Sequence, residues 1–133
     1  MSTFVLRSKN YWGTGDQADD RAIPFRVLSA ATTNATQVVV RPVMLTSLMA
    51  INTSASVRFL KIYDSASIPT AGSGTPVWTI PIPSATTGAG FSLPIPIPIG
   101  FNNGIGLTIT ANIGDTDATA IAANDITIVG AYL

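Results

Sequence analysis

Residues that could do chemistry are few in this chain of 133 residues, and the most concentrated set lies near its C-terminal end. The loop sequence GDTDATAIAAND, residues 114–125, brings together Asp115, Asp117, Asn124 and Asp125. Oxygen ligands at alternate positions could hold a calcium ion, although this spacing is not that of an EF-hand. Aspartate and asparagine also form turns by bonding to nearby backbone N–H groups. We favour turn formation for this loop and keep a calcium site as the alternative.

The rest of the inventory argues against catalysis. The chain has no histidine, cysteine or glutamate, which leaves acid–base and metal chemistry to aspartates, two lysines and three tyrosines. It contains no Gly-x-Ser-x-Gly elbow, no paired-carboxylate signature and no Walker loop. We therefore predict that the protein is not an enzyme and has no cofactor.

Isolated cations and aromatic residues have ordinary structural explanations. Arg58 and Lys61 could bind an anion, but we expect them to lie on a solvated sheet face or to pair with an aspartate such as Asp64. Trp78 and Phe91 fall in apolar runs of strand length, and we assign them to the core rather than to a ligand platform. Nucleic-acid binding is not predicted, because no basic patch with interleaved aromatic residues is present.

Strands must position these side chains, because the composition favours strands over helices. Threonine, isoleucine and valine recur along the chain, and apolar runs alternate with clusters of turn-forming residues. Short strands without intervening helices predict an all-β fold, an antiparallel β-sandwich of the eight-stranded jelly-roll type. The eight strands are expected near Phe25–Leu28, Gln37–Val40, Val43–Ile51, Val57–Tyr63, Val77–Ile82, Gly90–Ile97, Gly106–Asn112 and Asp125–Ala131.

One expected strand has proline at every second position, in the sequence FSLPIPIPIGF, residues 91–101. Successive N–H groups of a strand point to opposite edges, so these prolines remove donors from one edge only. An edge without donors cannot recruit a further strand. We therefore predict an edge strand in which one side chain type faces the core and the other faces away. The inward residues would be Ile95, Ile97 and Ile99, and the outward residues Pro94, Pro96 and Pro98.

Charge is scarce, and this bears on partners. Only 11% of the residues are charged, against about 25% in an ordinary soluble domain. A surface so poor in charge favours self-association over a well-solvated monomer. The net charge of zero favours neither a polyphosphate nor an anionic membrane.

The start of the sequence lacks the apolar core of a secretory signal, and the apolar stretch Val38–Ile51 is too short to span a bilayer. We therefore expect synthesis in the cytoplasm and no insertion into a membrane.

The first 26 residues differ from the rest, because they hold seven of the fourteen charged residues. We divide the chain into an extended N-terminal arm, residues 1–26, and a β-sandwich domain, residues 27–133. A short edge strand is possible at Thr3–Leu6. The arm either grips a neighbouring subunit or folds back on its own domain, and both readings stay open. The candidate interface residues are Phe4, Leu6, Arg7, Tyr11, Trp12 and Arg21.

Two stretches of the sequence resemble a family of small virion structural proteins of tailed bacteriophages. They are SVRFLKIYDSASIPTAGSGTPVWTIPIP, residues 56–83, and GIGLTITANIGDTDATAIAANDITIVGAYL, residues 104–133. Such proteins show a leucine–lysine–aliphatic–tyrosine run, a small-residue loop, a TIPIP-like strand and a DTD…A…D loop. The resemblance covers roughly residues 50–133, and residues 1–35 lie outside it. It implies a β-sandwich that coats or caps a phage particle, either on the head or on the tail.

These observations predict a non-enzymatic virion structural protein, made in the host cytoplasm and located in the virion. We expect a capsid decoration (cement) protein that binds the major capsid protein or other virion proteins and bridges neighbouring capsid subunits. We expect it to form a homo-oligomer, in particular a trimer, with no nucleic acid, membrane or small-molecule partner. The alternatives are a tail, baseplate or fibre component of the same virion and a carbohydrate-binding β-sandwich module.

Overall fold

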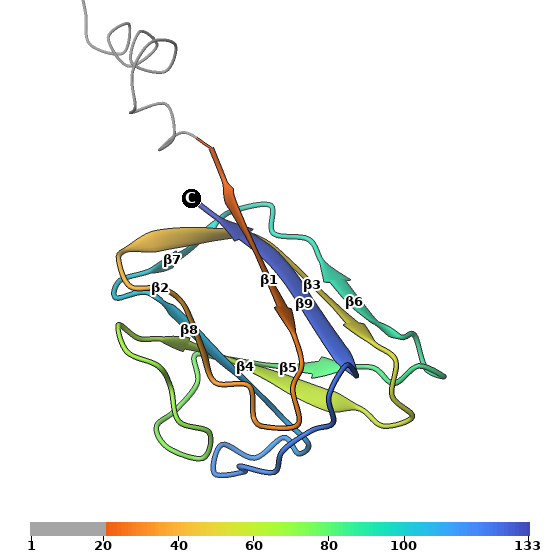
Figure 1. The fold of residues 1–133 in the computed structure, drawn as a ribbon. Helices are drawn as coiled ribbons and strands as arrows, with labels where there is room; N and C mark the ends of the chain where they lie inside the picture. The colour runs from red at the N-terminus through yellow and green to blue at the C-terminus, as the bar shows by residue number, and fades with distance from the viewer. Residues whose placement is uncertain (1–20) are drawn as a thin grey trace, which may run out of the picture.

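The computed structural model describes residues 21–133 as two antiparallel β-sheets packed together (Figure 1). Sheet A has the strand order β1-β9-β3-β6, and β7 also pairs with β3. Sheet B has the order β2-β8-β4-β5. Residues 21–133 contain no helix and therefore no apolar helix long enough to cross a membrane. The strands are β1 (Ile23–Leu28), β2 (Thr36–Val39), β3 (Val43–Asn52), β4 (Arg58–Asp64), β5 (Trp78–Ile82), β6 (Gly90–Leu93), β7 (Ile99–Phe101), β8 (Ile105–Thr110) and β9 (Ile126–Tyr132).

The strands pair in a nested order. The innermost pair is β4 with β5, and around it lie β3 with β6 and β7, then β2 with β8, then β1 with β9. Two further pairings, β3 with β9 and β4 with β8, join these hairpin-like pairs into the two sheets. Strands β1 to β4 consequently alternate between the sheets, and the first and last strands of the fold are neighbours.

The core lies between the sheets and follows from the period-two alternation of the strands. In β3 the residues Val43 and Leu45 are buried and, after an irregularity between Leu45 and Ser47 shifts the alternation by one residue, Leu48 and Ala50 are buried. Burying an aliphatic side chain of this size stabilises the fold by about 1.5–3 kcal/mol. Sheet B meets this layer with Leu60, Ile62, Ile82, Leu107 and Ile109.

The predicted β-sandwich is confirmed, and seven of the eight predicted strands lie within two residues of observed ones. Ile23–Arg26, which we assigned to the arm, form the first part of β1 and pair with β9, so the sheet begins at Ile23. The possible strand at Thr3–Leu6 lies outside the residues that the structure describes.

The predicted strand Gly90–Ile97 is interrupted at the prolines. It lies at the sheet edge as expected, because β6 and β7 each pair only with β3, but residues 94–98 form no strand. Leu93 pairs with Leu48 and Ile99 with Leu45, so six residue steps of the edge chain face three steps of β3. The extra residues are pushed out of the ladder, because proline fixes φ and restricts the residue before it.

The prediction for the side chains of this segment is therefore wrong in part. Ile95 and Ile99 are half-buried, and the three prolines are exposed, as predicted. Ile97 is not buried but 79% exposed, because it lies in the bend that the extra residues create. The segment leaves the sheet edge as an apolar protrusion rather than completing it.

Candidate interaction surface

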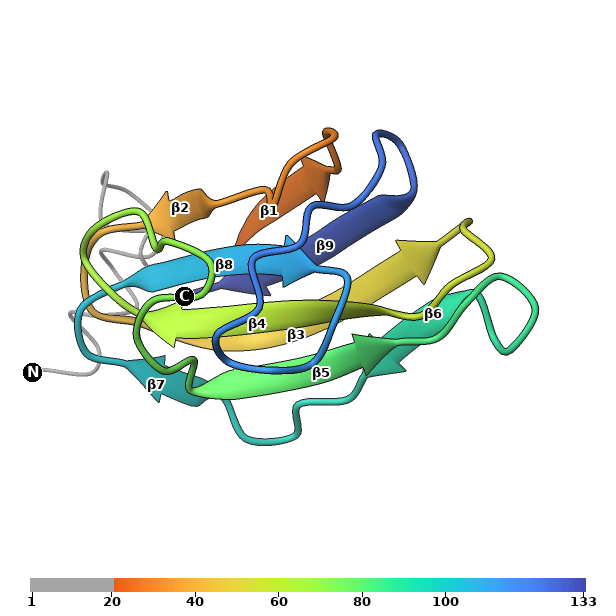
Figure 2. The same cartoon turned by 90° about the horizontal axis from the view of Figure 1, so that it is seen from below.

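Sheet B is covered on its outer side by the protein's own loops. Figure 2 shows the loop between β8 and β9 lying across β4. Every residue of β8 is buried, although alternate residues of a strand point to opposite faces. A Cβ atom added to Gly106 would lie 2.8 Å from Cδ of Pro69, and one added to Gly72 would lie 2.9 Å from the Thr116 carbonyl oxygen. The loops 65–77 and 111–125 therefore pack on this face and against each other.

Lys61 points into this covered face and is 0% exposed. Its Nζ donates a hydrogen bond to the carbonyl of Gly114, in the loop between β8 and β9. This corrects the expectation that Lys61 lies on a solvated face or pairs with Asp64. The loop covers the strand, and the long lysine side chain reaches a backbone acceptor of that loop. Arg58 is half-buried, and its Nη1 donates to the Val57 carbonyl at 3.4 Å.

Asp64 has a structural role at the end of β4. Its two carboxylate oxygens accept hydrogen bonds from the backbone N–H groups of Asn102, at 3.0 Å, and Asn103, at 2.8 Å. Burial acts to raise the pKa of Asp64, but the backbone N–H groups of Asn102, Asn103 and Gly104 outweigh it and hold the pKa below its ordinary value. The carboxylate fixes the turn between β7 and β8 and is already occupied there.

The acidic loop 114–125 shows turn chemistry. Oδ1 of Asp117 accepts from Nδ2 of Asn112 at 3.0 Å and from Oγ1 of Thr119 at 2.8 Å, and Oδ2 accepts the backbone N–H of Asn112 at 3.2 Å. The backbone N–H of Asn124 instead bonds to the Ser29 carbonyl at 2.8 Å. Within residues 21–133, no three acidic, histidine or cysteine side chains come together as a metal site.

This network predicts a pH effect on the loop. The hydrogen bond from the Asn112 side chain, with those from the Thr119 side chain and from the backbone N–H groups of both residues, outweighs burial and lowers the pKa of Asp117 from 3.8 to about 2. Because the folded pKa is lowered, the stabilising contribution is present above the unfolded pKa and is lost as pH falls from about 4 to about 2. We expect the protection factors of the amides of residues 112–119, measured against an unfolded chain at the same pH, to fall over this range. Asp117→Asn should show the lower protection factors already at pH 6, whereas Asp115→Asn, outside the network, should behave as wild type.

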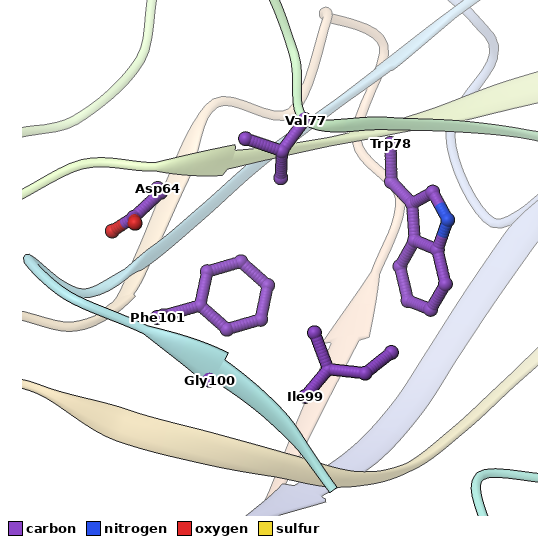
Figure 3. Close-up of a pocket in the computed structure, with 6 residues that line it drawn as sticks. All are labelled: Asp64, Val77, Trp78, Ile99, Gly100 and Phe101. Atoms are coloured by element: carbon purple, nitrogen blue, oxygen red, sulfur yellow. The ribbon is translucent and has the colours of Figure 1, made fainter. Parts of the chain in front are cut away.

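A cleft of about 290 Å³ lies between β5 and β7, at the open edge of the sandwich. Its apolar walls are Val77, Trp78, Ile99 and Phe101, while Asp64 and Trp78 lie at opposite ends (Figure 3). Sugar binding by an aromatic side chain also requires polar groups that are free to bind the hydroxyls. The Asp64 carboxylate is engaged by the turn, so this cleft offers a hydrophobic recess and no arrangement for acid–base chemistry.

The outer face of sheet A, in contrast, is left bare by residues 21–133. We use this name, the bare face, for the outward residues of β1, β9, β3 and β6. Strand register places Arg26, Val129, Met49 and Ser92 in one row across the sheet. The next row contains Leu28, Thr127 and Ile51, and Met44 and Ala131 lie toward the other end.

The bare face is apolar and almost uncharged. Leu28 is 46% exposed and Met49 is 37% exposed, and Met44 and Ile51 are similarly exposed. Arg26 is the one charged residue in the five strands of sheet A. Exposed apolar surface of this kind on a flat sheet is typical of an interaction site. We therefore take the bare face as the candidate functional site of the described part of the chain.

The predicted interface residues are only partly placed. Arg21 is exposed and lies two residues before β1, at the border of the bare face. Phe4, Leu6, Arg7, Tyr11 and Trp12 lie outside the described residues. Sequence reasoning did not identify the bare face itself. The run Val43–Ile51 could have indicated this face, because it is nearly continuously apolar and therefore apolar on both sides of the strand.

Comparisons with known proteins found no match for this chain among protein-family models, curated proteins or solved structures.

Proposed function

We propose that this protein is a non-enzymatic structural subunit of a bacteriophage virion, a decoration protein that binds and bridges neighbouring capsid subunits. One observation carries the proposal: loops of the described residues cover one outer face of the sandwich and not the other. Loops 65–77 and 111–125 cover sheet B, whereas residues 21–133 leave the bare face of sheet A apolar and almost without charge. A face of this kind suits burial against other protein.

Two further observations support the proposal. We interpret the nested pairing of the strands as a jelly roll, an architecture found in viral capsid domains. The sequence of residues 56–83 and 104–133 resembles small virion proteins of tailed phages. On this proposal the protein is located in the virion, forms a homo-oligomer and has the major capsid protein or another virion protein as its partner.

A tail, baseplate or fibre component would have the same surface chemistry. The experiment must therefore distinguish this alternative from a head decoration protein. The carbohydrate-binding alternative finds less support, because Tyr63 is buried and Trp78 is half-buried against the core. An aligned row of exposed aromatic side chains, which such modules use, does not occur on either sheet within residues 21–133.

The test is the copy number of the chain in purified virions of the phage that encodes it, measured by quantitative mass spectrometry against the major capsid protein. A head decoration protein repeats with the capsid lattice, so we expect hundreds of copies per particle. Immunogold labelling should place them over the head. A few copies, or labelling confined to the tail, would favour the tail alternative. Absence from particles would overturn the proposal.

A further inference from the structure

The N-terminal segment, residues 1–20, joins the described fold at the border of the bare face. It connects through Arg21 and Ala22 to β1, which is the edge strand of sheet A. The outward residues of β1, among them Arg26 and Leu28, belong to the bare face. A chain that enters the fold at this point is attached next to an apolar surface that the rest of residues 21–133 leaves open.

The segment is long enough to cross such a face. Neighbouring strands lie about 4.8 Å apart, so the four strands of the face span about 15 Å across the sheet. Twenty residues of extended chain reach at most about 70 Å. Length therefore permits the segment to cover a sheet face and still bridge the gap to a neighbouring molecule.

The chemistry of the segment matches that of the bare face. Its apolar residues form two clusters, Phe4–Leu6 and Tyr11–Trp12, which suit the exposed Leu28, Met49 and Ile51. The part nearest β1 carries three acids, and the border of the face carries Arg21 and Arg26. Opposite charges at one end of an apolar contact fix its register. The acids are Asp16, Asp19 and Asp20.

The charge content of the chain favours the face of another molecule over the chain's own. Only 11% of the residues are charged, and a surface so poor in charge favours association between copies over a well-solvated monomer. A second copy offers the same bare face, so exchange of the segments would cover this face on both molecules.

We propose that residues 1–20 of one copy bind across the bare face of a second copy, so that subunits are linked by exchange of their N-terminal segments. The bridging role of this contact rests on the proposed function. To that function the contact adds a partner for the bare face, namely a second copy of the chain. The contact itself can be measured with purified protein, so its failure is distinguishable from absence of the protein from virions.

The experiment uses full-length proteins in sedimentation velocity over about 1–100 µM. Three variants are compared with wild type: Met49→Glu on the bare face, the double variant Phe4→Glu/Trp12→Glu in the segment, and Ile97→Glu as a control. Ile97 is an exposed apolar residue of the 94–98 protrusion, which follows β6 at the edge of sheet A opposite β1. Matching thermal transitions show that each variant is folded. Met44→Glu is a second face variant in case Met49→Glu unfolds.

We expect wild type and Ile97→Glu to associate alike as concentration rises. The face variant and the segment variant should each raise the dissociation constant at least tenfold, since a buried charge in an apolar contact costs about 1.4 kcal/mol or more. An equimolar mixture of these two should recover association, because one supplies an intact segment and the other an intact face. Wild type that stays monomeric, association that persists in both face variants, or a mixture no better than its components would each overturn the exchange.

Discussion

Replacing Gly90 with alanine is expected to destabilise the protein by about 3 kcal/mol or more. Gly90 opens β6 with φ of +119°, and an added Cβ would lie 2.0 Å from the carbonyl oxygen of Ala50 on the neighbouring β3. The left-handed backbone costs an L residue about 1–3 kcal/mol, and moving a central strand costs a further amount of the same order. Urea unfolding followed by tryptophan fluorescence measures the loss directly.

Two other glycines provide matched controls. Gly100 lies on β7 of the same sheet edge, has no atom within 4 Å of an added Cβ and does not have a positive φ. Gly100→Ala should change the free energy of unfolding by less than about 0.5 kcal/mol. Gly74 has φ of +73° but open space around it, so Gly74→Ala should cost only about 1 kcal/mol. If Gly90→Ala were as mild as Gly74→Ala, the close approach of β6 to β3 would be wrong.

Lys61→Ala is expected to lose about 2–4 kcal/mol of stability and to loosen the cover over sheet B. The side chain is fully buried between β4 and the loop 111–125, so its removal leaves a cavity and withdraws the bond to the Gly114 carbonyl. Thr108, its cross-strand neighbour on β8, is also fully buried, and water would then reach the strand beneath. Amide hydrogen exchange should rise most in residues 111–119.

Lys61→Met separates packing from hydrogen bonding at this site. Methionine keeps most of the volume but cannot donate to Gly114, whose carbonyl still accepts the N–H of Asp117 at 3.0 Å. The exchange therefore leaves no backbone acceptor of Gly114 without a hydrogen bond. We therefore expect Lys61→Met to remain within about 1.5 kcal/mol of wild type. A loss equal to that of Lys61→Ala would instead show that the hydrogen bond anchors the loop.

Sequence patterns predicted the strands well, because turn-forming residues bound each strand. The alternation of apolar and polar residues within a strand is also a local signal. The prolines at 94, 96 and 98 located an edge, since a missing N–H can be tolerated only there. The prolines did not reveal that residues 94–98 leave the ladder as a protrusion. The six residue steps from Leu93 to Ile99 could face six steps of β3 or only three. Which of these occurs depends on where Leu93 and Ile99 pair with β3, and this pairing is a long-range property.

The candidate site was harder to predict, because it depends on which face the loops cover. A lysine alternating with Leu60 and Ile62 is the usual pattern for a solvent-facing position, and only the return of loop 111–125 buries Lys61. Sheet A is the side that the described residues leave uncovered. Nothing within the sequence of a strand states whether a loop fifty residues later will cover it. The Asp117 turn, in contrast, is local, and aspartate spacing was sufficient to favour it.

The nested pairing of strands determines how this protein can be made. Leu28 of β1 pairs with Thr127 of β9, so β1 must wait for a strand that is made about a hundred residues later. At roughly 5–20 residues per second, about a hundred intervening residues delay that partner by about 5–20 s. The hairpin of β4 and β5 can close early, but β1 lacks its partner until β9 has been made. Stop codons before β9, or slow translation of the residues that lead to it, should therefore yield chains with an unpaired β1, which are prone to aggregate.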